Sequence, residues 1–220
     1  VLGAVAVLML LEPHLSGTLL ILGIGAVLMF VGGTALRWFI LAGAGAVGAV
    51  GAAVAVMPGL VPYAASRLAS WLDPFADPLG DGHQTIQSLY AIGSGGATGL
   101  GLGNSRQKHL FVPEPQNDFI FSIVCEELGF VGALAVVGLF VLLLLRGITL
   151  AVRAPDRFGG LLVVGFVVQV AMQAALNIAV VTNTIPNTGI SLPFFSSGGT
   201  SLMMLLGEMG IVLSVSRQEA

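Results

Sequence analysis

The stretch that decides the fold is residues 118–145, which read DFIFSIVCEELGFVGALAVVGLFVLLLL. After Asp118, only Glu126 and Glu127 carry charge, and nearly all the other residues are apolar. A helix needs about 20 predominantly apolar residues to cross a bilayer. The stretch therefore predicts a transmembrane helix from Phe119 to Leu145 that begins directly after an acidic residue.

The composition extends this prediction to the whole chain. Of the 220 residues, 56% are hydrophobic and only 9% are charged, and the mean hydropathy is +0.99. A soluble domain carries charge on about a quarter of its residues. Many of the 31 glycines lie in apolar runs such as 43–45 and 48–51, which suits close helix packing in lipid. We expect an all-α integral membrane protein, folded as a polytopic helical bundle.

Polar breaks divide the chain into apolar segments that are long enough to cross a bilayer. Complete spans are predicted at 18–33, 38–57, 119–145, 158–181 and 201–215. Residues 1–11 are about half of a span, so we expect the sequence to be the C-terminal part of a longer protein. The predicted organisation is a partial span and two helices over 1–57, one long loop over 58–118, and three helices over 119–220.

Basic residues predict the orientation of these spans, because short cytoplasmic loops are rich in Lys and Arg. If the spans alternate, the arginines at 37, 146, 153, 157 and 217 fall on one side, and the connection 183–200 on the other side has no basic residue. We therefore expect the loop 58–118 to be extracytoplasmic. Within it, prolines at 58, 62, 74 and 78 are expected to break regular structure, and 84–92 is expected to form a short helix.

Several function classes receive no support. The net charge of −3 is not gathered into a basic cluster, so no nucleic acid partner is expected. Cys125 lies in an apolar span and is interpreted as a small buried side chain. His14, His83 and His109 lack the spacing of a zinc site, so no metal site is predicted. Glycines at 93–96 and 99–103 follow no strand, so they are interpreted as loop hinges and not as a nucleotide-binding loop.

Asp118 is the candidate catalytic residue. A carboxylate before the first helical turn is stabilised by unpaired backbone N–H groups, and most such residues are helix caps. Here the helix is a membrane span, so the carboxylate lies where a lipid-linked substrate would present its head group. From the residues alone, the cap and the catalytic interpretation are both open.

Two glutamates lie deeper in the same span. Glu126 and Glu127 are about 12 Å beyond Asp118 at 1.5 Å per residue. Intramembrane carboxylates are unfavourable unless they are paired, protonated or in contact with water. Structural pairing with neighbouring helices is the favoured interpretation. The candidate partners are Glu208, Asn177 and Arg37.

Two further features are polar. Gln169, Gln173 and Asn177 form a stripe on an apolar helix, which interhelical hydrogen bonds explain. The connection 186–201, PNTGISLPFFSSGGTS, leads into a helix whose N-terminus can bind an anion or cap itself, and the sequence favours neither. Arg106 and Lys108 precede Asp118 in the long loop, an order suited either to holding a diphosphate and deprotonating an alcohol or to a solvated loop.

Five motifs resemble, in order, the SEDS family of FtsW, RodA and SpoVE. They are Gln87–Gly96, Gly101–Lys108, Pro113–Phe121, Glu126–Gly129 and Thr188–Phe194. The resemblance covers essentially the whole chain and corresponds to the second half of a ten-span protein. The stretch 104–108, NSRQK, is more similar to the FtsW and SpoVE branch than to RodA. The chain departs from the family's common residues at His14, Gln116, Asn117 and Ser197.

This resemblance implies a peptidoglycan glycosyltransferase of the bacterial cytoplasmic membrane that polymerises lipid II at its outer face during division or sporulation. The implied partners are lipid II, a class B penicillin-binding protein and other divisome proteins. Asp118 matches the family's essential loop aspartate, and we expect it to act as general base on a sugar hydroxyl. The expected substrate-binding residues are Arg67, Arg106, Lys108, Glu114, Ser196 and Thr200. No cofactor is assigned, although a divalent cation, Mg²⁺ or Mn²⁺, can share the diphosphate charge.

Two other classes stay open from the residues alone. A lipid flippase or transporter would use the intramembrane Glu126, Glu127 and Glu208. A non-catalytic scaffold would only position a penicillin-binding protein. The resemblance favours the transferase.

Overall fold

The computed structural model describes residues 3, 5, 15–56, 60–80, 82–108 and 116–219. Within these residues the regular secondary structure is entirely helical, which confirms the predicted fold class. The α-helices are α2 (Leu15–Val31), α3 (Leu36–Val56), α4 (Leu60–Leu72), α5 (His83–Gly95), α6 (Ile120–Arg153), α7 (Arg157–Val181) and α8 (Gly199–Ser216). Two short 3₁₀ helices, η1 (Pro74–Ala76) and η2 (Arg217–Glu219), complete the set.

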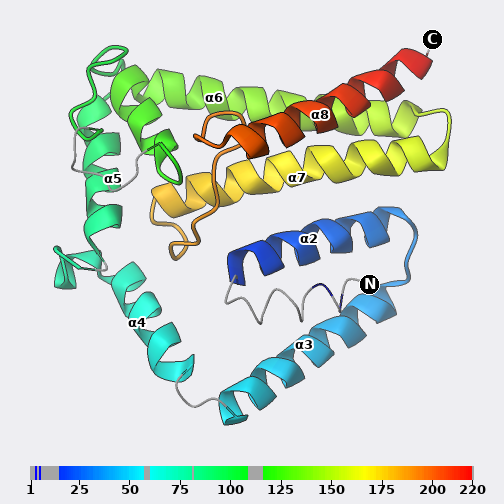
Figure 1. Cartoon of the computed structure of the whole chain (residues 1–220), viewed down its shortest axis with the longest axis horizontal. Helices are drawn as coiled ribbons and strands as arrows, with labels where there is room; N and C mark the ends of the chain where they lie inside the picture. The colour runs from blue at the N-terminus through cyan, green and yellow to red at the C-terminus, as the bar shows by residue number, and fades with distance from the viewer. Residues whose placement is uncertain are drawn as a thin grey trace.

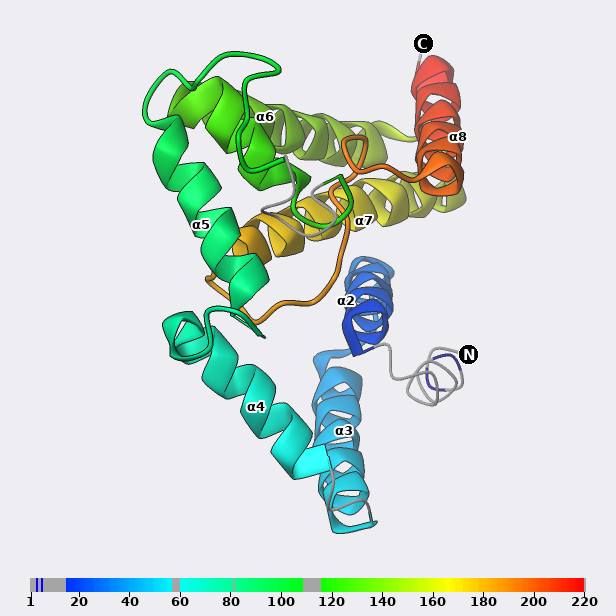
Figure 2. The ribbon, with the colours of Figure 1, turned by 60° about the vertical axis from the view of Figure 1, so that its left-hand side comes forward.

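Helices α6, α7 and α8 form the bundle on which the other elements pack. They run side by side in Figure 1, and α6 and α7 are antiparallel neighbours. Helix α2 packs on α7, and α5 packs against the first part of α6. Helix α3 lies apart from this bundle in both views (Figures 1 and 2). Helix α4 meets it at the connection after α7, where Trp71 Nε1 donates to Asn183 O at 3.1 Å.

Three helices of the described chain are long and apolar enough to cross a membrane, namely α6, α7 and α8. They match the three spans predicted for the C-terminal part. Helix α6 continues to Arg153, eight residues past the predicted end at Leu145, so that Arg146 lies inside the helix. The predicted spans 18–33 and 38–57 coincide with α2 and α3, whose searched stretches, Ser16–Val31 and Leu36–Gly48, are apolar but shorter.

The close helix contacts use other glycines than the ones the sequence suggested. A Cβ on Gly23 of α2 would overlap the Met172 side chain of α7, and one on Gly147 of α6 would overlap Val167 of α7. Small residues at these points let the helix backbones approach. In contrast, a Cβ on any of the α3 glycines at 43, 45, 48 and 51 would meet no described atom within 4 Å. Their expected packing role is therefore not confirmed.

The bundle has two different ends. The α2–α3 and α6–α7 connections and the end of α8 lie together on the right of Figure 1, and they bring Arg37, Arg153, Arg157 and Arg217 to one end. The start of α6, α5 and the connection between α7 and α8 lie at the opposite end. Four of the five arginines predicted to share one side thus lie at this end, while Arg146 lies within α6. The assignment of that end to the cytoplasm stays a prediction.

The region 58–118 contains more helix than expected. Helix α5 confirms the predicted helix at 84–92 and is longer by a few residues. Helix α4 differs from the prediction, in which Pro62 breaks regular structure. Pro62 is the third residue of α4, where an N–H has no intrahelical acceptor, so proline is tolerated there.

Helix α6 is interrupted at Gly129, which has φ 67° and ψ −168°. In an unbroken helix, the N–H groups of Phe130 and Val131 would donate to the carbonyls of Glu126 and Glu127. The break separates these donors from those acceptors. Four backbone groups inside an apolar helix therefore need other partners, because water does not reach them in a membrane.

The loop that follows α5 supplies all four partners. The hydrogen bonds run from Phe130 N to Gly96 O (2.9 Å), from Val131 N to Ala97 O (3.2 Å), from Leu100 N to Glu126 O (3.0 Å) and from Gly101 N to Glu127 O (3.0 Å). We call this segment, residues 96–101, the inserted loop. It replaces the missing helical hydrogen bonds of α6, so the region 99–103 is fixed to a membrane helix and is not the hinge that the sequence suggested.

Two glycines make this insertion sterically feasible. Gly99 and Gly129 have φ values of 79° and 67°, in the region that favours glycine. A Cβ on Gly129 would overlap the backbone nitrogen of Gly99, and a Cβ on Gly99 would overlap the carbonyl oxygen of Glu127. Each glycine therefore leaves the room that the other segment occupies.

We expect Gly129→Ala to destabilise the protein, because the new methyl group meets both a positive φ and the inserted loop. The midpoint of thermal unfolding in detergent should fall by on the order of 5 °C or more. Gly138→Ala in the same helix is the matched control, since a Cβ there meets no described atom within 4 Å. It should leave the midpoint unchanged or slightly higher. Equal midpoints for the two variants would contradict the interlocked arrangement.

Candidate functional site

A pocket of about 300 Å³ lies where the start of α6, the α7–α8 connection and the start of α8 meet. Its lining includes Asp118, Ser191, Ser196, Ser197 and Ser201, together with apolar groups such as Leu202 and Leu205. The pocket therefore has one carboxylate among several hydroxyls. The sequence regions 116–118 and 186–201, which were singled out separately, meet here.

Asp118 is a half-buried residue of this pocket. The N-cap position of α6 belongs to Phe119, the next residue, which is fully buried and makes no side-chain capping bond. Gly189, with φ 67°, also lines the pocket, and a Cβ built there would lie 3.4 Å from Asp118 Oδ2. The carboxylate is thus next to a stretch of backbone that carries no side chain.

Two side chains fix the backbone around Asp118. The Asn177 amide, fully buried on α7, donates to the carbonyls of Asp118 and Ile190, each at 2.7 Å. The Ser196 hydroxyl donates to the carbonyl of Asn117 at 2.6 Å and accepts from Leu192 N at 2.8 Å. These bonds join the chain before α6 to the α7–α8 connection. Asn177 therefore serves the predicted network role, although it bonds to backbone carbonyls and not to the glutamates.

The α7–α8 connection contributes pocket residues that the sequence did not single out. Ser191 and Phe194 line the pocket, as does Ser201 of the first turn of α8, and Ser197 N donates to the Gln116 carbonyl at 2.7 Å. Phe194 has φ 67°, an uncommon conformation for a bulky residue, and such strain is often found at functional sites. The density of turn formers and hydroxyls in 186–201 was the available signal. It identified the segment but not which of its residues face the pocket.

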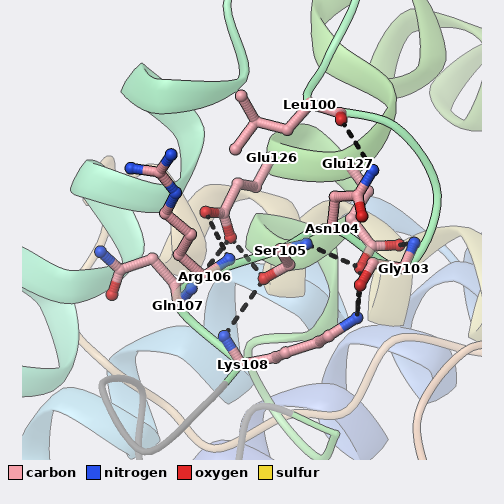
Figure 3. Close-up of polar contacts among 9 residues, drawn as sticks. All are labelled: Leu100, Gly103, Asn104, Ser105, Arg106, Gln107, Lys108, Glu126 and Glu127. Carbon is pink, nitrogen blue, oxygen red and sulfur yellow. Dashed lines mark hydrogen bonds and ion pairs between the residues drawn. The ribbon is translucent and has the colours of Figure 1, made fainter.

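Glu126 and Glu127 hold the chain that follows the inserted loop (Figure 3). Glu126, only 1% exposed, accepts hydrogen bonds from Ser105 Oγ (2.5 Å), Arg106 N (3.0 Å) and Gln107 N (3.3 Å). Glu127 accepts from Gly103 N (3.0 Å), Ser105 N (3.3 Å) and Lys108 Nζ (2.9 Å). We call this set of contacts the glutamate latch. Both glutamates therefore form hydrogen-bond networks with a loop, and not with the neighbouring helices that were predicted.

The partners predicted for these glutamates were wrong. Neither carboxylate bonds to Glu208, Asn177 or Arg37; both bind the loop 103–108 instead. Glu208 accepts from the Gln169 amide of α7 at 3.2 and 3.3 Å. This second pair joins α7 to α8, and it confirms interhelical hydrogen bonding for the first residue of the predicted polar stripe.

The candidate cations are in different surroundings. Lys108 forms an ion pair with Glu127 at 2.9 Å and also donates to Gly103 O at 2.6 Å. Arg106 is exposed, and Figure 3 shows its guanidinium directed away from both carboxylates. Arg67 of α4 is exposed and donates to Asn187 O, on the α7–α8 connection, at 3.4 Å. Their roles in substrate binding stay predictions.

The remaining predicted residues lie at the edge of the pocket or outside the described part of the chain. Thr200 is exposed in the first turn of α8, and its neighbour Ser201 lines the pocket in its place. Glu114 and His14 lie outside the described residues. Among the residues that the structure describes, no three His, Cys, Asp or Glu gather where they could hold a metal ion. The described residues thus offer no protein cage of these side chains for a divalent cation.

Comparison with known proteins decides the family. The model of the cell cycle protein family FtsW/RodA/SpoVE matches residues 1–220. The chain belongs to the FtsW/RodA/SpoVE family. It is 47% identical to stage V sporulation protein E of Bacillus subtilis over 94% of this chain and 55% of that protein. It is 43% identical to a probable peptidoglycan glycosyltransferase FtsW of Thioalkalivibrio sp. over 99% of this chain and 54% of that protein.

Solved structures of the family share the fold. A chain of a peptidoglycan synthase complex, studied for the structural coordination of polymerization and crosslinking, matches with a TM-score of 0.75 and 38% identity over 98% of this chain and 59% of that one. A mutant of the rod shape determining protein RodA of Thermus thermophilus matches with a TM-score of 0.61 and 30% identity, over 98% of this chain and 54% of that one. The chain spans about half the length of the relatives it matches, and it is a bacterial membrane protein.

We expect Asn177→Ala to loosen the chain around Asp118, because the carbonyls of Asp118 and Ile190 both lose their donor. Leaving buried polar groups unpaired costs about 2 kcal/mol. Amide hydrogen exchange of peptides covering 116–122 and 189–193 should become faster. Gln173→Ala, one turn earlier on the same helix, is the control and should leave both peptides unchanged. Equal exchange in the two variants would remove Asn177 from this role.

Proposed function

We propose that this protein is a peptidoglycan glycosyltransferase that polymerises lipid II, the undecaprenyl-diphosphate-linked disaccharide peptide. The support is the family, in which relatives about 40% identical over most of this chain are named probable peptidoglycan glycosyltransferases. The observation that carries the proposal is the pocket. It places a single half-buried carboxylate beside serine hydroxyls, at the end of the bundle opposite to the clustered arginines.

In the proposed reaction, Asp118 is the general base. Its carboxylate takes the proton from the 4-hydroxyl of the acceptor sugar, and the oxygen attacks the anomeric carbon of the donor. The bond from that carbon to the diphosphate breaks with inversion, and undecaprenyl diphosphate leaves with the bonding electrons. A base must lie within hydrogen-bond reach of the proton it removes. The bonds from Asn177 and Ser196 support this role, because they hold the Asp118 backbone at the pocket wall.

The leaving diphosphate is strongly anionic, so its developing charge needs cations. Electrostatic stabilisation of this kind is usually the largest catalytic contribution. The loop that ends at Asp118 carries Arg106 and Lys108, and Arg67 lies against the α7–α8 connection. The sequence assigns all three side chains to the diphosphate, but their surroundings differ: Arg106 and Arg67 are exposed, whereas Lys108 is already paired with Glu127. A divalent cation, Mg²⁺ or Mn²⁺, bound to the diphosphate would also offset part of this charge.

The proposed setting is the outer face of the bacterial cytoplasmic membrane. The arginines at one end of the bundle mark the cytoplasmic side by the positive-inside rule, which directs the pocket outward. The proposed partners are a class B penicillin-binding protein and other divisome proteins. Similarity to a chain of a peptidoglycan synthase complex supports the first of these.

The geometry gives less support to a flippase. A transporter would need the intramembrane glutamates to meet substrate or protons, whereas Glu126 and Glu127 each accept three hydrogen bonds from their own chain. Glu208 is held by Gln169. A scaffold without chemistry does not require a pocket carboxylate whose backbone is held by two buried or half-buried side chains.

Asp118→Asn should abolish most lipid II polymerisation in the full-length protein complexed with its penicillin-binding protein. Loss of a general base lowers turnover about 10²- to 10⁴-fold. The control is Asp73→Asn, which removes a carboxylate from an exposed residue between α4 and η1. It should polymerise like the parent protein.

Three results would count against the proposal. Near-normal turnover by Asp118→Asn would remove Asp118 from the mechanism. Absence of polymer from the parent complex, with the partner's own enzymes disabled, would favour the scaffold. Loss of lipid translocation in glutamate variants that still polymerise would favour the flippase.

A further inference from the structure

We propose that the two cations of the loop have separate roles. Lys108 is part of the glutamate latch, and Arg106 is the residue that meets the diphosphate of the lipid-linked sugar. Glu126 and Glu127 are then positioning residues that hold Arg106 at a fixed distance from Asp118. This inference rests on the proposed transferase function and assigns its diphosphate subsite.

The ammonium of Lys108 is already engaged by the protein. Its Nζ donates to Glu127 Oε1 at 2.9 Å and to Gly103 O at 2.6 Å, and its backbone N–H donates to Ser105 Oγ at 3.1 Å. Two of the three ammonium donors are thus occupied, and a carboxylate neutralises the charge. If Lys108 moved to a diphosphate, it would leave Glu127 without its counter-charge inside a membrane helix, which is unfavourable.

Arg106 has the opposite arrangement. Its backbone N–H is fixed to Glu126 Oε1 at 3.0 Å, while its side chain is exposed. Among the described residues, its guanidinium makes no hydrogen bond or ion pair. Figure 3 shows it extending away from the latch. A guanidinium presents a planar set of donors that matches phosphate oxygens in a bidentate manner, so a fixed backbone with an extended side chain suits anion binding.

Helix α6 sets the separation between this cation and the base. Asp118 lies just before the helix, and Glu126 follows eight residues later, about 12 Å along the axis at 1.5 Å per residue. The carboxylate of Glu126 binds the Arg106 backbone directly. In the proposed reaction, Asp118 acts on the acceptor hydroxyl and Arg106 on the donor diphosphate. The attacking and the leaving oxygen lie on opposite sides of one anomeric carbon, so the two protein groups must be a constant distance apart. The latch ties Arg106 to the same helix that begins just after Asp118.

The inference predicts different consequences for the two cations. In the polymerisation assay on the full-length complex, Arg106→Ala should raise KM for lipid II about 10-fold or more and weaken inhibition by inorganic pyrophosphate to a similar extent. Its midpoint of thermal unfolding should equal that of the parent. Arg106→Lys, which keeps the charge but loses the planar donors, should fall between Ala and the parent. Arg153→Ala, at the opposite end of α6, is the matched control and should change none of these values.

Lys108→Met and Glu127→Gln should behave as one unit. Each should lower the thermal midpoint, and the double variant should be no less stable than the worse single variant, because both remove the same ion pair. Glu208→Gln is the control for losing a membrane-helix carboxylate, and it should show no coupling with Lys108→Met. This thermal cycle needs no catalytic assay, so it decides the latch independently of the transferase proposal.

The outcomes separate the two proposals. If Asp118→Asn is inactive but Arg106→Ala matches Arg153→Ala, the diphosphate assignment is wrong and the transferase proposal stands. If Lys108→Met weakens pyrophosphate inhibition as strongly as Arg106→Ala at an unchanged thermal midpoint, Lys108 is a binding group and the division of roles is overturned. Additive midpoints for Lys108→Met and Glu127→Gln would equally overturn it. If Asp118→Asn polymerises normally, the transferase mechanism itself fails.

Discussion

The exchange of backbone hydrogen bonds at Gly129 is the constraint on which the rest of the site depends. A membrane helix cannot leave its N–H and C=O groups unpaired, because the bilayer offers no water to replace them. Helix α6 breaks nevertheless, and the inserted loop supplies every missing partner. That insertion determines where the chain emerges after α5. From there, residues 103–108 lie directly over the carboxylates of Glu126 and Glu127.

The loop is then fixed a second time where it returns to the helix. Asn177 and Ser196 bind the backbone at 117–118, so the chain is held both over the second turn of α6 and at its start. Polar contacts shielded from water are stronger than the same contacts in solution, but only when every group is satisfied. Glu126 meets this condition with three donors although it is almost fully buried. Such a site needs little reorganisation when a charged substrate enters.

Hydropathy was sufficient to predict the three long apolar helices of the C-terminal part, because apolar length is a property of each segment alone. It located α6, α7 and α8. The position of Asp118 before α6 followed from where the apolar segment begins. Hydrogen-bond partners that are distant in the sequence were harder to predict. The partners of Glu126 are mainly backbone N–H groups about twenty residues earlier, and no residue type marks a backbone donor. For the same reason the role of Gly99 was missed, since it depends on the break at Gly129. The sequence motifs around both glycines were visible, but their contact required the fold.

The central claim is that the Asp118 pocket opens at the end of the bundle that faces outward. Cysteine accessibility tests this directly, because Cys125 is the only cysteine and is buried. In a Cys125→Ala background, Gln116→Cys introduces a thiol at an exposed position next to the pocket, and Arg153→Cys introduces one at the opposite end. A membrane-impermeant maleimide added to intact spheroplasts should label position 116 and leave position 153 unlabelled until the cells are lysed. The reverse pattern would place Asp118 on the cytoplasmic side and contradict the account.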